Sequence, residues 1–221
     1  MNKLQIIEWW DEYEVYKHCD FELQIIIRYF QERGLKTINF IDIGANVGKF
    51  YEVLSKKINI QSCYMVEPDT DLFNYLTSKY KEDEKTTLYN FALSDYSGLG
   101  FLSELDYIQE NINLGLAMIK PEGQGYEIQV KDACSFIKKV YDKTPSIDLI
   151  KIDTENQDYI ILDRIREVIE KLENKPLIVF EHNCWDDKKK AEEIYNKFLK
   201  IGYKGEPFSV LQGDCVIYPN N

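Results

Sequence analysis

Short apolar runs alternate with amphipathic segments along most of the chain, and this alternation predicts an α/β fold. Runs of consecutive apolar residues predict buried strands, whereas apolar residues that recur every three or four positions predict helices. The predicted strands cover 37–43, 60–66, 86–92, 146–153 and 176–181. The predicted helices cover 47–57, 70–81, 133–141, 156–171 and 187–201. Strands that alternate with helices form a mostly parallel sheet with helices on both faces.

Two amphipathic segments precede the first strand. They cover 3–18 and the stretch from Phe21 to Gly34, where a glycine is suited to end a helix. We therefore divide the chain into an N-terminal helical cap, 1–34, and one α/β domain, 35–221.

The alternation stops at two places within the larger domain. Between 94 and 132, apolar stretches at 98–102 and 126–130 predict a small inserted hairpin rather than a second domain. The chain ends in two further apolar stretches, 208–211 and 215–218, separated by a glycine turn. This ending predicts an antiparallel hairpin, which brings the main sheet to about seven strands.

The composition narrows the class of protein. The 221 residues carry a formal net charge of −11, which argues against nucleic-acid binding because that affinity depends on basic surface. The five cysteines are scattered singly, which is typical of a reducing compartment. No apolar stretch is long enough to span a membrane, and the N-terminus lacks a secretory signal pattern. We expect a cytoplasmic protein that binds neither nucleic acid nor a membrane, and the oligomeric state is not predicted.

The turn after the first strand carries the strongest chemical signal. Asp42 ends the apolar run, and Gly44, Asn46 and Gly48 follow at alternate positions before the next helix. A glycine turn of this kind lets a ligand approach backbone N–H groups at the positive end of a helix. A dinucleotide loop needs G-x-G-x-x-G, whereas this loop is G-x-N-x-G, and asparagine tolerates positive φ. The loop favours S-adenosylmethionine over NAD, with a tight turn that binds no ligand as the alternative.

An acid at the end of the second strand strengthens this interpretation. Glu67 follows Gly48 at the distance where a βαβ unit presents a carboxylate to the hydroxyl groups of a ribose. The alternative is an ordinary acid at the start of a helix, because Pro68 and Asp69 come next. The loop and the acid together favour a nucleotide-like ligand.

These motifs resemble those of the class I S-adenosylmethionine-dependent methyltransferases, and more narrowly those of the FkbM family. The resemblance rests on FIDIGANVG at 40–48, VEP at 66–68, NFALSD at 90–95 and IDLIKIDTE at 147–155. It implies a Rossmann-like class I methyltransferase fold, in which the C-terminal antiparallel hairpin differs from the dehydrogenases. The chain departs from the family at Asn156, where glycine is usual, and at Asp158, where glutamate is common.

The resemblance also implies roles for individual residues in binding S-adenosylmethionine. Asp42 and the 44–48 loop would hold the methionine part of the cofactor, and Glu67 would hold its ribose. Phe91 and Ala92 would flank the adenine. The residues expected to bind the cofactor are Asp42, Gly44, Ala45, Asn46, Gly48, Glu67, Pro68, Phe91, Ala92 and Asp153.

Two candidates for catalysis lie at the carboxyl ends of predicted strands. Because ligands bind beyond the carboxyl ends of such strands, Asp153 and His182 should lie near the transferred methyl group. The ordinary pKa of histidine suits His182 as a general base, although it could equally pair with a neighbouring acid or cap a helix. Thr154 and Gln157 have the spacing of a capping box, so nearby acids could simply serve that helix start.

Lys151 is a third candidate, because it interrupts an apolar strand. Strand alternation places it on the same face as Asp153. A buried ammonium group needs a partner, and an ion pair with Asp153 or Asp42 is the interpretation that we favour. The alternative is a lysine with a lowered pKa that acts in catalysis.

Together these features predict an S-adenosylmethionine-dependent O-methyltransferase that acts on a small molecule or a carbohydrate. The preference for a hydroxyl acceptor comes from the family resemblance alone. A catalytically decayed cofactor-binding or interaction module is the alternative, and a nicotinamide oxidoreductase is disfavoured by the glycine spacing. A divalent metal is left unassigned, although oxygen and imidazole donors gather at Asp153, Glu155, Glu181 and His182.

Overall fold

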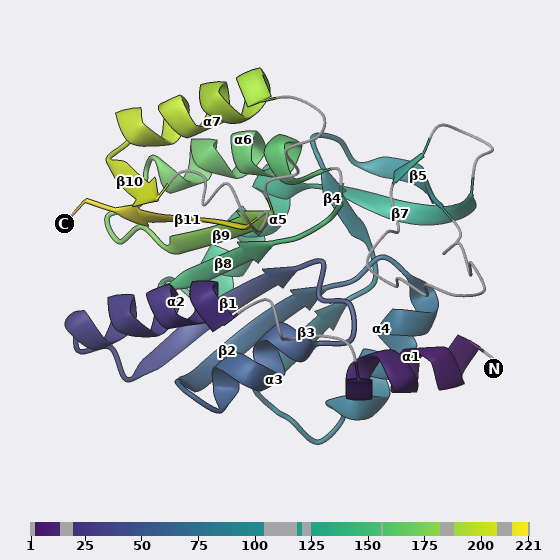
Figure 1. Cartoon of the computed structure of the whole chain (residues 1–221). Coiled ribbons are helices and arrows are strands. Elements are labelled where there is room, and N and C mark those ends of the chain that lie inside the picture. Colours follow the sequence, from purple (N-terminus) through teal and green to yellow (C-terminus); the bar gives the residue numbers. More distant parts are fainter. Residues whose placement is uncertain are drawn as a thin grey trace.

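The computed structural model describes residues 3–13, 20–103, 119–120, 125–155, 157–181, 188–206 and 214–220. Figure 1 shows a large sheet through the middle of the molecule, and this sheet has seven strands as predicted. Across the sheet they are β10 (Tyr203–Glu206), β11 (Asp214–Pro219), β9 (Leu177–Glu181), β8 (Leu149–Ile152), β1 (Thr37–Ile43), β2 (Asn59–Val66) and β3 (Thr86–Tyr89). The helices are α1 (Lys3–Tyr13), α2 (Asp20–Glu32), α3 (Lys49–Ser55), α4 (Thr70–Lys79), α5 (Ala133–Lys143), α6 (Asp158–Ile169) and α7 (Lys188–Lys200).

The strand order makes β1 the switch point of the sheet, because the strands that follow it in sequence are added first on one side of it and then on the other. From β1 the sheet extends through β2 and β3 on one side and through β8 and β9 on the other, and all these strands are parallel. Beyond β9, β11 and β10 pair in antiparallel fashion, which confirms the predicted C-terminal hairpin. In open α/β sheets, ligands bind at such a switch point, beyond the carboxyl ends of the strands. A ligand is therefore expected where β1, β2 and β8 end.

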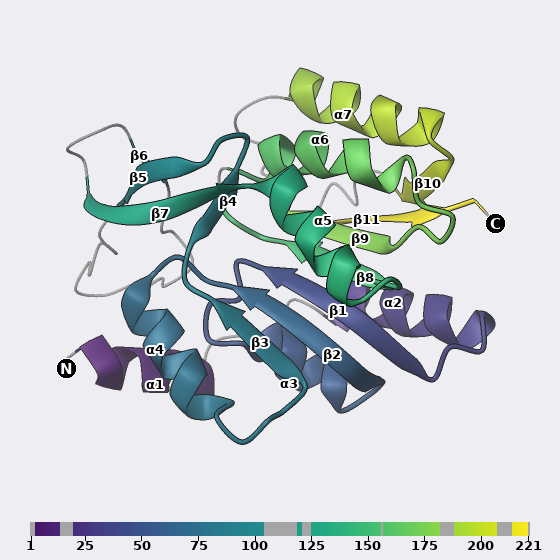
Figure 2. The same cartoon turned by 180° about the vertical axis from the view of Figure 1, so that it is seen from behind.

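Helices cover both faces of this sheet, as Figures 1 and 2 show. Successive residues of β1 point to opposite faces and join different cores. Phe40 packs in the core that contains Phe50 of α3, whereas Ile41 packs in the core that contains Ile137 of α5 and Ile165 of α6. Both cores are closed to solvent, so the central strands form a rigid support for the loops at their ends.

The two N-terminal helices occupy different places. Ile7 of α1 packs against Val47 and Leu72, beside α4, whereas Ile26 and Phe30 of α2 belong to the core of the main sheet. The predicted first helix extends to 18, but residues 14–19 lie outside the described part of the chain. The division after residue 34 stays a prediction. Among the helices of the described residues, none is long and apolar enough to cross a membrane.

The inserted element is larger than the predicted hairpin. Antiparallel β5 (Gly98–Leu102) and β7 (Tyr126–Asp132) are present, and β4 (Ala92–Ser94) and β6 (Ile119–Lys120) complete a second, four-stranded sheet. The predicted strand 86–92 is therefore wrong as one element, since it splits into β3 and β4. The amide of Asn90 donates hydrogen bonds to the carbonyl groups of Glu67 and Pro68, so the chain leaves the main sheet there. Figure 2 shows β4 crossing from one sheet to the other.

The C-terminal hairpin also differs in detail from the prediction. Its first strand is β10, at 203–206, directly after α7, while the predicted strand 208–211 lies outside the described residues. Gly202, with a φ of +88°, allows the sharp turn from α7. Tyr203 is then buried, and its hydroxyl donates a hydrogen bond of 2.7 Å to the carbonyl of Pro176. This buried anchor starts the strand earlier than the apolar pattern indicated.

Candidate functional site

The loop after β1 needs residues that accept left-handed backbone angles. Gly44, Asn46 and Gly48 have φ values of +79°, +51° and +76°. The backbone N–H groups of Gly44 and Ala45 donate to the carbonyl of Val66, at 2.9 and 3.1 Å, which ties the loop to the end of β2. The positive φ values delay the following helix, so α3 begins at Lys49 and not at 47 as predicted. The alternating Gly-Asn-Gly pattern is thus explained by backbone geometry.

Gly44 also brings the ends of β1 and β8 together. A Cβ atom at this position would overlap the backbone carbonyl of Asp153, and one at Gly48 would lie 2.6 Å from the Tyr80 ring. The loop is held from its other side as well, because the hydroxyl of Tyr80 donates to the carbonyl of Gly48 at 2.9 Å. The loop and the end of β8 therefore form one continuous surface.

We expect Gly44→Ala to lower the free energy of unfolding more than Gly34→Ala does. Both glycines have positive φ, which costs an alanine about 1–2 kcal/mol. A Cβ at Gly34 meets nothing within 4 Å, so only the backbone strain applies there, whereas Gly44→Ala adds the overlap with Asp153. Urea denaturation of both variants measures the difference. Equal losses would contradict the close approach of β1 and β8.

Glu67 lies beside this loop at the end of β2. Its side chain is buried, and its two oxygens accept hydrogen bonds from the backbone N–H groups of Asn46, at 2.8 Å, and Asp69, at 2.9 Å. Burial raises the pKa of Glu67 to about 7, and the two backbone donors act in the opposite direction. A carboxylate in this setting is held rigidly and is poised to accept further hydrogen bonds from a ligand.

A cavity opens between these elements, where ligands bind in sheets of this kind. Many of the residues predicted to bind the cofactor line it: Gly44, Asn46, Glu67, Pro68, Phe91, Ala92 and Asp153. Asp42, Ala45, Gly48 and Lys151 do not line it. The structure thus brings together residues that are far apart in the sequence, while Asp42 and Lys151 lie behind the cavity wall.

One side of the cavity is an apolar wall that the sequence interpretation missed. Leu72 of α4, Leu93 of β4, Leu102 of β5 and Ile119 of β6 line it together with Phe91. Leu102 and Ile119 come from the second sheet and are paired strand to strand. The sequence shows that these residues are apolar. It does not show that they line the cavity, because that depends on strand pairing in the second sheet between segments that are distant in the sequence.

Lys151 forms the predicted ion pair, and with both candidate partners. Its Nζ lies 3.5 Å from Oδ1 of Asp42 and 3.2 Å from Oδ2 of Asp153, and it donates to the carbonyl of Gly44 at 3.2 Å. Asp42 is fully buried, and burial raises its pKa to about 6 although the Lys151 charge acts to lower it. The ammonium group therefore links the base of the glycine loop to the end of β8. A catalytic role for Lys151 stays a prediction.

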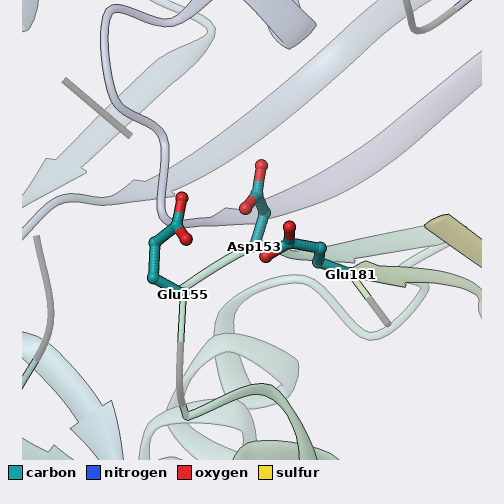
Figure 3. A group of neighbouring side chains, drawn as sticks. All are labelled: Asp153, Glu155 and Glu181. Carbon is teal, nitrogen blue, oxygen red and sulfur yellow. The ribbon is translucent and has the colours of Figure 1, made fainter. Parts of the chain in front are cut away.

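Figure 3 shows three carboxylates that lie close together, and two of them, Asp153 and Glu155, line the cavity. Asp153, Glu155 and Glu181 each offer one oxygen, and these oxygens all lie within 4.8 Å of one another. Burial raises the pKa of Glu155 to about 8, and the charges of Asp153 and Asp158 act in the same direction. Such a group can accept hydrogen bonds from hydroxyl groups or provide part of a coordination shell for a cation. His182, the other proposed catalytic residue, lies outside the described residues.

The predicted capping box at Thr154 and Gln157 is wrong. Helix α6 begins at Asp158, and Thr154 instead donates to the Asp158 carboxylate from its backbone N–H at 3.3 Å and its hydroxyl at 2.8 Å. Gln157 accepts from the hydroxyl of Ser94 at 2.8 Å. Glu155 has a φ of +65°, so the chain turns at this residue. Asp153 does not cap α6, which leaves its carboxylate available at the cavity.

Comparison with known proteins agrees with this geometry. The family model described as the methyltransferase FkbM domain matches residues 42–204, which is more than half of the chain. The chain belongs to the FkbM methyltransferase family. The match begins at Asp42, at the end of β1, and ends within β10. The FkbM domain therefore includes the glycine loop, Glu67, the inserted sheet and Asp153.

Solved structures place this FkbM domain among the Rossmann-like methyltransferase folds. An FkbM methyltransferase from Methylobacillus flagellatus KT has a TM-score of 0.55 and 15% identity, over 98% of this chain and 58% of that chain. A precorrin-6y C5,15-methyltransferase from Geobacter metallireducens GS-15 has a TM-score of 0.50 and 13% identity, over 95% of each chain. The present chain thus spans little more than half of the Methylobacillus protein. A search of curated proteins finds no significant match.

Proposed function

We propose that this FkbM-family protein transfers a methyl group from S-adenosylmethionine to a hydroxyl group of a small molecule or a carbohydrate. The observation that carries the proposal is the cavity at the switch point of the sheet. It has the buried Glu67 carboxylate on one side and Asp153 on the other, with the Gly44–Gly48 loop between them. The fold and the family support this use of the cavity.

The chemistry of the residues that line the cavity fits S-adenosylmethionine. Glu67 would accept hydrogen bonds from the two ribose hydroxyl groups, and the apolar wall with Phe91 would hold the adenine. The backbone N–H groups and positive-φ residues of the loop allow close approach of the methionine part. Asp153 would face the cationic end of the ligand. When bound, the cofactor supplies an electrophilic methyl group.

The acceptor side is dominated by carboxylates. An acceptor hydroxyl beside Asp153 would donate its proton to that carboxylate as the methyl group is transferred, and Lys151, whose Nζ lies 3.2 Å from Oδ2, would hold the carboxylate in place. Glu155 and Glu181 would hold neighbouring hydroxyl groups of the acceptor. Even with Glu155 protonated, this acidic group disfavours phosphorylated acceptors, and the net charge of −11 disfavours nucleic acids. A neutral acceptor with several hydroxyl groups is the best match.

Isothermal titration calorimetry tests the proposal at its first step. We expect S-adenosylmethionine and its demethylated product to bind with dissociation constants on the order of micromolar, whereas NAD should not bind. A folded protein that binds neither methyl-donor ligand would contradict the proposal. Binding without methyl transfer to any of a panel of sugars and polyols would instead favour the catalytically decayed module.

Asp153→Asn is expected to lower kcat for a hydroxyl acceptor about a hundredfold, because an amide cannot take up the acceptor proton. The change keeps the side-chain shape, so the dissociation constant for S-adenosylmethionine should change much less than kcat. Steady-state rates at saturating cofactor measure the effect once an acceptor is found. Lys204→Met, on β10, changes a charge away from the cavity and serves as the control. An unchanged kcat in Asp153→Asn would remove Asp153 from the reaction.

A further inference from the structure

We propose that Asp69 is a positioning residue that couples the inserted sheet to Glu67, with Tyr126 as its partner. The inference rests on the proposed function, because it concerns how the ribose-binding acid is held. Asp69 lies two residues after Glu67, and its side chain is almost fully buried. It touches three parts of the molecule that are separate in sequence.

The first of these contacts is with Glu67, the residue proposed to bind the ribose. The backbone N–H of Asp69 donates to Oε1 of Glu67 at 2.9 Å. Oδ1 of Asp69 accepts from the N–H groups of Asp71 at 2.8 Å and Leu72 at 3.0 Å, which caps the N-terminus of α4. Leu72 also lines the cavity. The cap and the Glu67 contact fix the backbone of Asp69 in one position.

The second carboxylate oxygen of Asp69, Oδ2, has its partners outside α4, the helix that Asp69 caps. Oδ2 accepts a hydrogen bond of 2.7 Å from the hydroxyl of Tyr126, and Lys3 Nζ of α1 lies 3.3 Å from it. A helix cap requires only one side-chain acceptor, so the two further contacts are not explained by capping. They join the inserted sheet and α1 to the residue that holds Glu67.

Tyr126 is the residue of β7 that lies opposite a residue of the cavity wall. It pairs across the second sheet with Leu102, which forms part of the apolar wall. Burial and the charge of Asp69 raise the pKa of Tyr126, so its hydroxyl stays a donor throughout the neutral range. The hydrogen bond between Tyr126 and Asp69 therefore fixes the position of the apolar wall of the cavity relative to Glu67.

Loss of the hydrogen bond between Tyr126 and Asp69 should raise the pKa of Glu67. The charged groups that influence Glu67 are Asp69, which raises its pKa, and Lys151, which lowers it. Without the Tyr126 hydroxyl, the Asp69 charge is less neutralised and its backbone N–H is less firmly held against Glu67. Both changes favour the protonated form of Glu67, which has one acceptor fewer for the ribose.

The test compares two variants that remove the bond from opposite sides. Tyr126→Phe deletes the donor, and Asp69→Ser keeps a side-chain cap for α4 but deletes the second oxygen. At pH 8, where Glu67 is ionised in every variant, each should weaken binding of S-adenosylmethionine about three- to tenfold, and the double variant should lose no more than either single variant. The pH midpoint of binding should move upward in Tyr126→Phe and downward in Asp69→Ser, which removes the charge that raises the pKa of Glu67. Tyr96→Phe, a change at an exposed tyrosine near the same sheet, is the matched control.

The outcomes separate this inference from the proposed function. If the unaltered protein binds the cofactor and Tyr126→Phe binds it equally well at the same pH midpoint, the coupling is overturned. Additive losses in the double variant would also overturn it, because they would show two independent structural effects. If the unaltered protein binds no methyl-donor ligand, the proposed function fails and the inference falls with it.

Discussion

Glu67→Ala is expected to weaken binding of S-adenosylmethionine about a hundredfold or more. Two hydrogen bonds from ribose hydroxyl groups to a carboxylate contribute about 1.5–3 kcal/mol each, and each 1.4 kcal/mol changes affinity about tenfold. The variant also releases the backbone N–H groups of Asn46 and Asp69, so the loop is less well ordered before binding. Isothermal titration measures the affinity, and circular dichroism shows whether the fold is kept.

Asp148→Ala is the matched control for that experiment. Asp148 also accepts a backbone hydrogen bond, from Asn39 at 2.8 Å, but it lies at the opposite end of the sheet from the cavity. Its replacement should lower stability without changing affinity. If Glu67→Ala binds the cofactor within about threefold of the unaltered protein, each lost hydrogen bond would be worth far less than expected, and the ribose role would be wrong.

The same carboxylate predicts how affinity depends on pH. The pKa of Glu67 in the folded protein is about 7, above its ordinary value of 4.5, so its ionisation costs stability as the pH rises between these values. Ligand hydroxyl groups donate to the ionised form and lower the pKa. Binding should therefore release a proton and strengthen as the pH rises through about 7. Titrations at pH 6 and pH 8 in buffers of different ionisation enthalpy would detect both effects.

The parts of the site that the sequence predicted well are those governed by local backbone chemistry. Asn46 was expected to accept positive φ, and it does so between two glycines. Lys151 was expected to need a buried acid, and strand alternation placed it beside Asp153. In both places the physical constraint acts within a few residues or along one strand, so a single sequence contains the information.

The parts that differed depend on contacts between distant segments. The apolar pattern of 86–92 is continuous, but Asn90 bonds to the loop after β2 and divides it into strands of two sheets. The spacing of Thr154 and Gln157 suits a capping box, but the turn at Glu155 directs Thr154 to Asp158 instead. Leu102 and Ile119 reach the cavity only through pairing in the second sheet. None of these partners can be read from periodicity.

Lys151→Met is expected to lower the free energy of unfolding by about 3 kcal/mol at pH 8, well above the pKa of about 6 of Asp42, because it leaves the buried Asp42 carboxylate without its cation. The oxygens of Asp42 have no hydrogen-bond partner among the described residues, and Lys151 Nζ lies 3.5 Å away. Urea denaturation measures the loss. Arg164→Met is the control, since its pair with Asp132 is partly exposed and should contribute about 1 kcal/mol or less.

The loss should depend on pH in a definite direction. Asp42 has a pKa of about 6 in the folded chain, above its ordinary value of 3.8, so its ionisation already costs stability as the pH rises from about 4 to 6. Without Lys151 that pKa rises further, and the cost extends to higher pH. The deficit of Lys151→Met should therefore be small below about pH 6, where Asp42 is protonated in both folded proteins, and should grow as the pH rises above 6. Adding Asp42→Asn should restore most of the stability at pH 8. A deficit that persists in the double variant would show that the loss arises from packing and not from the unpaired charge.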